Sequence, residues 1–159
     1  MVNGKIFGIG LTKTGNKSLC QYLVNQGIKA QHFPTGRDIF LGDYQAYLDT
    51  PCVAHLDSIV RNYPDAKFIY TCRNNDDWIT SCLKHFVLTE NFKLNYYRQL
   101  VYGSFFPTAQ DLINAKEALE SKIQSINNLL ILPLEENDKA RQVNDFLGFE
   151  RYLDYPQIP

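Results

Sequence analysis

The chain has 159 residues, of which 45% are hydrophobic and 21% charged, and these values predict one soluble globular domain spanning residues 1–159. The net charge of −1 argues against broad electrostatic binding to DNA, RNA or an anionic membrane, but it allows a small basic pocket. Four cysteines without C-x-x-C spacing, no leader segment and no apolar run of ~18 residues together predict a cytoplasmic protein with reduced thiols.

The first predicted element runs from Lys5 to Leu19 and reads KIFGIGLTKTGNKSL. A short apolar run, a glycine-rich turn and an amphipathic segment follow one another, which is the strand, turn and helix order of a phosphate-binding loop. Glycine lets the backbone approach an anion, and unpaired N–H groups at the helix start point at it. The nucleotide-kinase pattern G-x-x-x-x-G-K-[ST] does not fit, because Asn16 intervenes between Gly15 and Lys17.

The rest of the chain alternates short apolar runs with amphipathic segments. Further strands are expected at residues 28–33, 46–48, 67–72 and 129–134. Helices are expected from the loop to residue 25 and at about 52–63, 77–86, 109–126 and 138–147, with an irregular aromatic stretch at 86–106. This alternation predicts an α/β fold with three α/β/α layers and a central, mostly parallel sheet, similar to that of P-loop NTPases.

Two polar residues follow the predicted strand at 67–72, which reads KFIYTC. Arg73 leaves the strand end, and Ser81 comes eight residues later in the next helix. The guanidinium group suits a phosphate because it can form two parallel charge-assisted hydrogen bonds. A surface ion pair of Arg73 with Asp76 or Asp77 is the alternative.

These two motifs resemble those of the PAPS-dependent sulfotransferases, in the small soluble branch of that family. The loop keeps the K-T-G of the family as Lys13, Thr14 and Gly15, whereas Asn16 and Lys17 stand where two threonines are usual. The resemblance continues in D-T-P at 49–51, Y-G-S at 102–104 and N-D-F-L-G-F near the C-terminus, and so covers most of the chain. An R-K-G segment, which other members use as a further clamp, is not found.

The resemblance implies that PAPS is the sulfuryl donor and PAP the product, with no metal. Arg73 and Ser81 are then expected to hold the 3′-phosphate, and Lys13 to neutralise charge on the leaving phosphate. The 5′ side of the nucleotide is expected to lie on the loop residues Thr12, Lys13, Thr14, Gly15, Asn16, Lys17 and Ser18.

Asp49 is the predicted catalytic base. It follows the strand at 46–48, and ligands of open α/β sheets bind at this edge. The acceptor must lose a proton as it attacks sulfur, and family members place a His or Glu at a comparable strand end. Asp49 could instead cap the next helix or orient a cation of the site. The alternative bases are His32, His55 and His85, of which the last two are more typical of structural positions.

The sequence thus predicts an enzyme that moves a sulfuryl group from PAPS to a hydroxyl or amine of an unidentified small-molecule acceptor. A phenolic or other apolar acceptor would suit the aromatic stretch at 86–106. Two alternatives stay open: an ATP- and Mg²⁺-dependent P-loop kinase with Asp49 as metal ligand, and a module that binds PAP or a related nucleotide without turnover. The sequence predicts neither the acceptor nor the oligomeric state.

Overall fold

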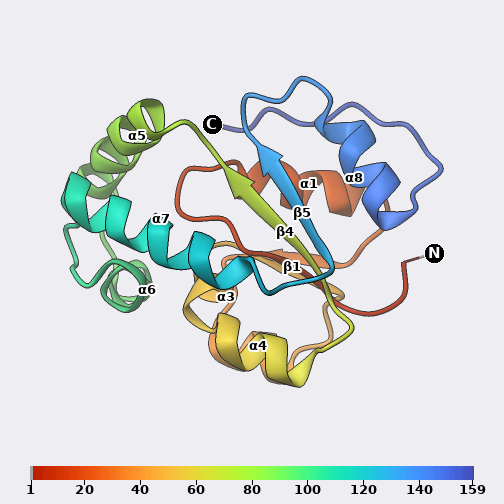
Figure 1. The fold of residues 1–159 in the computed structure, drawn as a ribbon, viewed down its shortest axis with the longest axis horizontal. Helices are drawn as coiled ribbons and strands as arrows, with labels where there is room; N and C mark the ends of the chain where they lie inside the picture. The colour runs from red at the N-terminus through yellow and green to blue at the C-terminus, as the bar shows by residue number, and fades with distance from the viewer. Residues whose placement is uncertain (1) are drawn as a thin grey trace.

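The computed structural model describes residues 2–159 and contains a sheet of five parallel strands in the order β2-β3-β1-β4-β5. The strands are β1 (Ile6–Gly8), β2 (Ala30–His32), β3 (Ala46–Leu48), β4 (Lys67–Cys72) and β5 (Leu129–Pro133). Figure 1 shows helices on both sides of the strands: α1 (Asn16–Asn25) and α8 (Lys139–Leu147) on one, and α3 (Thr50–Ala54), α4 (Leu56–Asn62) and α7 (Ala109–Ile123) on the other. The expected three-layer α/β/α fold is confirmed, and the sheet is wholly parallel.

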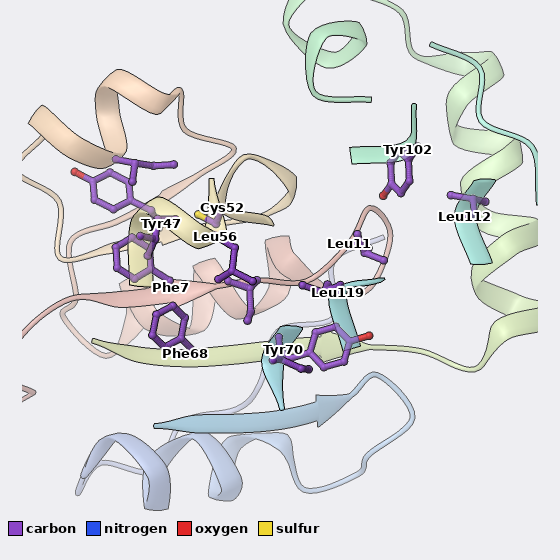
Figure 2. Packing of buried hydrophobic residues seen from close by; sticks show 14 of the residues in the cluster. Phe7, Leu11, Tyr47, Cys52, Leu56, Phe68, Tyr70, Tyr102, Leu112 and Leu119 are labelled. Carbon is purple, nitrogen blue, oxygen red and sulfur yellow. The ribbon is translucent and has the colours of Figure 1, made fainter. Parts of the chain in front are cut away.

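Alternating side chains along the strands build a core on each face of the sheet. Phe7 and Phe68 pack on the face covered by α3, α4 and α7, with their ring centroids 5.8 Å apart (Figure 2). Ile6 and Ile69, one residue away along the same strands, pack on the face covered by α1 and α8. Burial on both faces explains why β1 and β4 read as apolar runs in the sequence.

The remaining helices are α2 (Gly36–Leu41), α5 (Asn75–Leu88) and α6 (Phe92–Tyr102). Local signals in the sequence set several helix ends. Helix α1 ends just before Gly27, whose φ of 89° is the left-handed conformation that glycine adopts readily. Helix α7 begins with a capping box, in which Thr108 and Asp111 each bond the other's backbone N–H.

The structure differs from the sequence predictions in three segments. The helix expected at 52–63 is two helices, because His55 takes a non-helical conformation and ends α3 before α4 begins. The stretch at 86–106 is largely helical, since α5 continues to Leu88 and α6 starts after the N-cap residue Asn91. Strand β5 lies at an edge of the sheet and leaves Ile131 exposed, where a buried strand was expected.

The aromatic segment was misread for a physical reason. Only Tyr97 and Tyr102 of its aromatic residues after α5 are buried, whereas Phe92 is almost fully exposed, so the apolar pattern has no clear helical period. Among residues 2–159, no helix combines the length and the apolar character needed to cross a membrane.

Candidate functional site

A cleft of about 800 Å³ opens where the parallel strands β2, β3, β1 and β4 end. This is the edge at which open α/β sheets bind ligands. The chain as a whole carries a net charge of −1, but the cleft is strongly basic. Its charged lining residues are five cations and one carboxylate: Lys13, Lys17, Arg73, Lys93, Arg98 and Asp49. The charge distribution favours an anionic ligand.

Backbone strain is concentrated at this cleft. Among residues 2–159, the non-glycine residues with positive φ are Lys13 (61°), Phe33 (52°) and Asp49 (92°), and all three line the cleft. Such conformations cost on the order of 1–3 kcal/mol each and persist only where surrounding structure enforces them. Their clustering is independent support for a functional role of the cleft.

Buried side chains hold the loop after β1 in place through hydrogen bonds. The Asn16 amide nitrogen donates to the carbonyl oxygens of Gly10 (3.1 Å) and Leu11 (3.0 Å), and the Asn16 amide oxygen accepts from Thr71 Oγ1 at 3.2 Å. Thr14 Oγ1 donates to the Leu11 carbonyl at 2.7 Å. The Asn16 side chain, where the family usually has threonine, is therefore used inside the protein and supports the loop.

Gly10 is required by this packing. A Cβ atom at this position would lie 1.8 Å from Thr71 Oγ1 and 2.6 Å from Thr14 Oγ1. We therefore expect Gly10→Ala to lower the free energy of unfolding by about 1–3 kcal/mol, as overpacking does. Denaturant titration checks this, with Gln21→Ala on the exposed face of α1 as a control that changes stability by less than ~0.5 kcal/mol. Equal stability of Gly10→Ala and the wild type would contradict the packing.

The start of α1 presents free hydrogen-bond donors. Gly15, with φ of 101°, is the N-cap, and no side chain bonds the first turn. The N–H groups of Gly15, Asn16, Lys17 and Ser18 have no hydrogen-bond partner within residues 2–159. Free donors at the positive end of a helix dipole form an anion site.

Thr12 is fixed by residues far away in the sequence. Its carbonyl oxygen accepts from Trp78 Nε1 (2.8 Å) and from Cys82 Sγ (3.3 Å), both on α5. Its N–H donates to Tyr102 Oη (3.0 Å), and this hydroxyl donates to Thr12 Oγ1 (2.9 Å). Burial raises the pKa of the Cys82 thiol to about 12, so Cys82 stays protonated and can donate. Helices α5 and α6 therefore fix the position of Thr12 in the loop after β1.

Sequence reasoning did not assign Trp78, Cys82 or Tyr102 to the site. The Y-G-S triplet that begins with Tyr102 was a usable signal, because it belongs to the segments that resemble the sulfotransferases. Its tyrosine positions Thr12 and does not line the cleft.

Arg73 follows β4 and lines the cleft with Ser81 of α5. Within residues 2–159 the Arg73 guanidinium forms no ion pair, so the alternative pairing with Asp76 or Asp77 is not seen. The Arg73 backbone is held separately, because its carbonyl oxygen accepts from Lys116 Nζ at 3.0 Å. The guanidinium group is therefore free to bind an anion.

Asp49 follows β3, and its carboxylate faces two neighbours. Oδ1 accepts from Thr50 N (2.6 Å) and Thr50 Oγ1 (2.8 Å), which is the helix-cap contact considered as an alternative role. Oδ2 lies 2.5 Å from Nε2 of His32, at the end of the adjacent strand β2. His32 also lines the cleft.

The other histidines differ in position. His85 of α5 lines the cleft, and its pKa is lowered, first by burial and then by the nearby Lys13. His55 does not line the cleft; it separates α3 from α4 and packs edge-on against Tyr97. The described residues 2–159 contain no group of three His, Cys, Asp or Glu side chains placed to hold a metal ion.

The cleft brings most of the predicted site residues together. Eight of the ten line it: Thr12, Lys13, Gly15, Asn16, Lys17, Asp49, Arg73 and Ser81. Thr14 and Ser18 do not, because the Thr14 hydroxyl is buried and bonded inside the protein, and Ser18 Oγ accepts from the backbone N–H of Ile158 at 2.9 Å. Ser18 can still contribute its free backbone N–H.

The fold and the cleft define an α/β protein with a basic cleft at the edge of a parallel sheet, suited to an anionic ligand. The family model described as "Sulfotransferase domain" matches residues 34–128, more than half of the chain. The chain therefore belongs to the sulfotransferase domain family, as its resemblance to that family implied. The matched range contains Asp49, Arg73 and Ser81 but not the loop after β1.

Two solved sulfotransferase structures share the fold. A sulfotransferase from Alicyclobacillus acidocaldarius is 16% identical, with a TM-score of 0.62 over all of this chain and 87% of that one. Mouse sulfotransferase SULT7A1, solved as a complex with PAP, is 15% identical, with a TM-score of 0.58 over 93% of this chain and 59% of that one. No curated protein sequence matches the chain.

Proposed function

We propose that this sulfotransferase uses PAPS as its donor and that the cleft binds PAPS and its product PAP. The observation that carries the proposal is that two unpaired anion-binding groups face one cleft from neighbouring strands: the N–H groups of Gly15–Ser18 after β1, and Arg73 after β4. A nucleotide with phosphates at both ends fits this pair of sites. Mouse SULT7A1, which shares the fold, was solved with PAP.

In this proposal the loop donors hold the 5′ side of the nucleotide, while Arg73 and Ser81 hold its 3′-phosphate. The bound donor supplies an activated sulfuryl group. Lys13 lies in the strained loop, and its Nζ forms no ion pair within residues 2–159, so its charge is available to stabilise the leaving phosphate. Lys17 adds a second charge at the helix start.

The acceptor is proposed to enter from the side of β2 and α6. The wall there contains Phe33, Leu94 and Tyr97, and the Phe33 and Tyr97 rings meet edge-on with centroids 5.7 Å apart. Lys93 Nζ donates to the Phe33 carbonyl oxygen at 2.6 Å and borders the same wall. Aromatic lining with nearby cations suits a hydroxyl or amine on an aromatic or apolar body. The acceptor is proposed as a small molecule, with residues 1–159 acting as one domain in the cytoplasm.

Calorimetric titration with PAP, and with ATP in the presence and absence of Mg²⁺, tests the donor assignment. We expect metal-independent PAP binding with a Kd at least tenfold below that of ATP, because only PAP offers a 3′-phosphate to Arg73. ATP binding that requires Mg²⁺ would point to a kinase, although both Asp49 carboxylate oxygens already face protein groups. PAP binding without sulfuryl transfer would favour a nucleotide-binding module. No binding of PAP would overturn the proposal.

A further inference from the structure

Asp49 is poorly placed to take the acceptor's proton itself. Oδ1 already accepts two hydrogen bonds from Thr50, and Oδ2 faces His32 Nε2 at 2.5 Å. The Asp49 side chain is also largely buried. Both carboxylate oxygens therefore already face protein groups before any acceptor arrives.

His32 presents complementary features. Nε2 is buried and has no hydrogen-bond partner, although Asp49 Oδ2 lies 2.5 Å away. Within residues 2–159 Nε2 is the buried side-chain nitrogen or oxygen without a hydrogen-bond partner, and the other ring nitrogen, Nδ1, is not among these buried atoms. The side chain is 28% exposed and lines the cleft. Active-site hydrogen bonds are often poorly aligned without substrate and tighten when it binds.

Backbone hydrogen bonds fix the positions of both His32 and Asp49. Phe33, directly after His32, and Asp49 both have positive φ. The Phe33 N–H donates to the Leu48 carbonyl oxygen and the Asp49 N–H to the Gly8 carbonyl oxygen, each at 3.0 Å. Strained backbone conformations that the surrounding structure enforces are typical of active sites.

We propose that His32 is the general base and that Asp49 is its positioning residue, an assignment that rests on the proposed function. The Asp49 carboxylate, whose Oδ2 lies 2.5 Å from Nε2, favours the ring proton on Nε2 and so leaves the lone pair of Nδ1 for the acceptor. As the acceptor oxygen forms its bond to sulfur, its proton passes to Nδ1. The sulfur–oxygen bond to the phosphate breaks, and its electron pair leaves on that phosphate. The products are PAP, the sulfated acceptor and a protonated His32.

His85 is the competing histidine in the cleft. It lies on α5 near Lys13, on the nucleotide side, and within residues 2–159 no carboxylate forms an ion pair with its ring, although the charge of Asp49 acts on it from a distance. Asp49 lies next to the acceptor wall on the β2 side, where an incoming hydroxyl is expected. His32 and His85 therefore differ in location, and only for His32 does the structure of residues 2–159 show a carboxylate in contact with the ring.

The first test is the ring tautomer of His32, measured by ¹⁵N NMR at neutral pH on the ligand-free protein. The wild type is expected to show the Nε2–H tautomer, and Asp49→Asn is expected to reduce that preference. Asparagine has the same shape as aspartate, meets the same backbone strain and can still accept from Thr50, so this variant should keep the fold. An Nδ1–H tautomer in the wild type, or an equal preference for Nε2–H in both proteins, would overturn the proposal.

The second test separates chemistry from binding. His32→Gln keeps an N–H for Asp49 but has no basic nitrogen, so transfer from PAPS to 2-naphthol should fall by about 10²–10⁴ with unchanged PAP affinity. His55→Gln, which changes a histidine outside the cleft, is the matched control and should retain most of the transfer. Wild-type turnover by His32→Gln, or a larger loss in His85→Gln, would overturn the assignment of the base. Failure of the wild type to bind PAP would instead overturn the proposed donor and leave the tautomer result standing.

Discussion

Arg73→Ala is expected to raise the Kd for PAP about a hundredfold or more. The guanidinium group has no ion pair within residues 2–159 and lines the cleft one strand away from the loop. Two charge-assisted hydrogen bonds to a phosphate contribute about 1.5–3 kcal/mol each, and a loss of about 3 kcal/mol corresponds to roughly a hundredfold in affinity. Calorimetric titration with PAP measures the change.

Three further variants show whether the effect belongs to the phosphate site. Arg73→Lys keeps the charge but loses the two-pronged geometry, so it should weaken PAP binding by about tenfold. Ser81→Ala removes one neutral donor and should also cost about tenfold or less. Arg61→Ala, at the exposed end of α4, is the control and should leave the Kd unchanged. Equal PAP affinity in the wild type and Arg73→Ala would exclude the 3′-phosphate assignment.

The sequence was sufficient to predict the parts of the fold that depend on local patterns. The apolar runs of β1 and β4, the glycine that follows α1 and the Thr108–Asp111 capping box all lie where local rules put them. The loop after β1 was recognised in the same way, since strand, glycine turn and helix are neighbours in the chain. The placement of this loop and Arg73 in one cleft followed from both lying at strand ends.

The parts that could not be predicted depend on which strands are neighbours. The pairing of β2 with β3 places His32 opposite Leu48 and therefore beside Asp49, and nothing in the local sequence specifies that order. The same applies to Thr12, whose partners Trp78 and Tyr102 come from helices 66 and 90 residues later. The sequence therefore offered Asp49 and His32 as separate candidate bases and did not predict their contact.

Asn16 departs from the usual motif of the family, because it stands where a threonine is expected. The sequence alone does not indicate what this replacement does to the loop. In the structure its amide supports the loop through two carbonyl oxygens and Thr71, while its backbone N–H stays free. The anion site itself is built from backbone groups, so the replacement leaves its donors intact.

Lys13→Met is expected to lower kcat by about 10²–10³ and to weaken PAP binding by about tenfold. Lys13 has φ of 61°, and methionine occupies that conformation at a similar cost, so the variant removes the charge while keeping the length of the side chain. Removing one group that stabilises charge in the transition state typically costs this much in kcat, whereas the charge of bound PAP is partly balanced by the loop N–H groups. Single-turnover transfer from PAPS and PAP calorimetry separate the two effects.

Two lysines nearby serve as comparisons for Lys13. Lys17→Met removes a cation that also lines the cleft but lies on the exposed side of α1, and it should lower kcat by about tenfold or less. Lys84→Met, exposed on α5 and outside the cleft, should change neither kcat nor Kd. A larger loss in Lys17→Met than in Lys13→Met would transfer the leaving-group role to Lys17. Because Lys13 lies in the loop and Lys17 on the helix, that outcome would mean the transferred group faces the helix start.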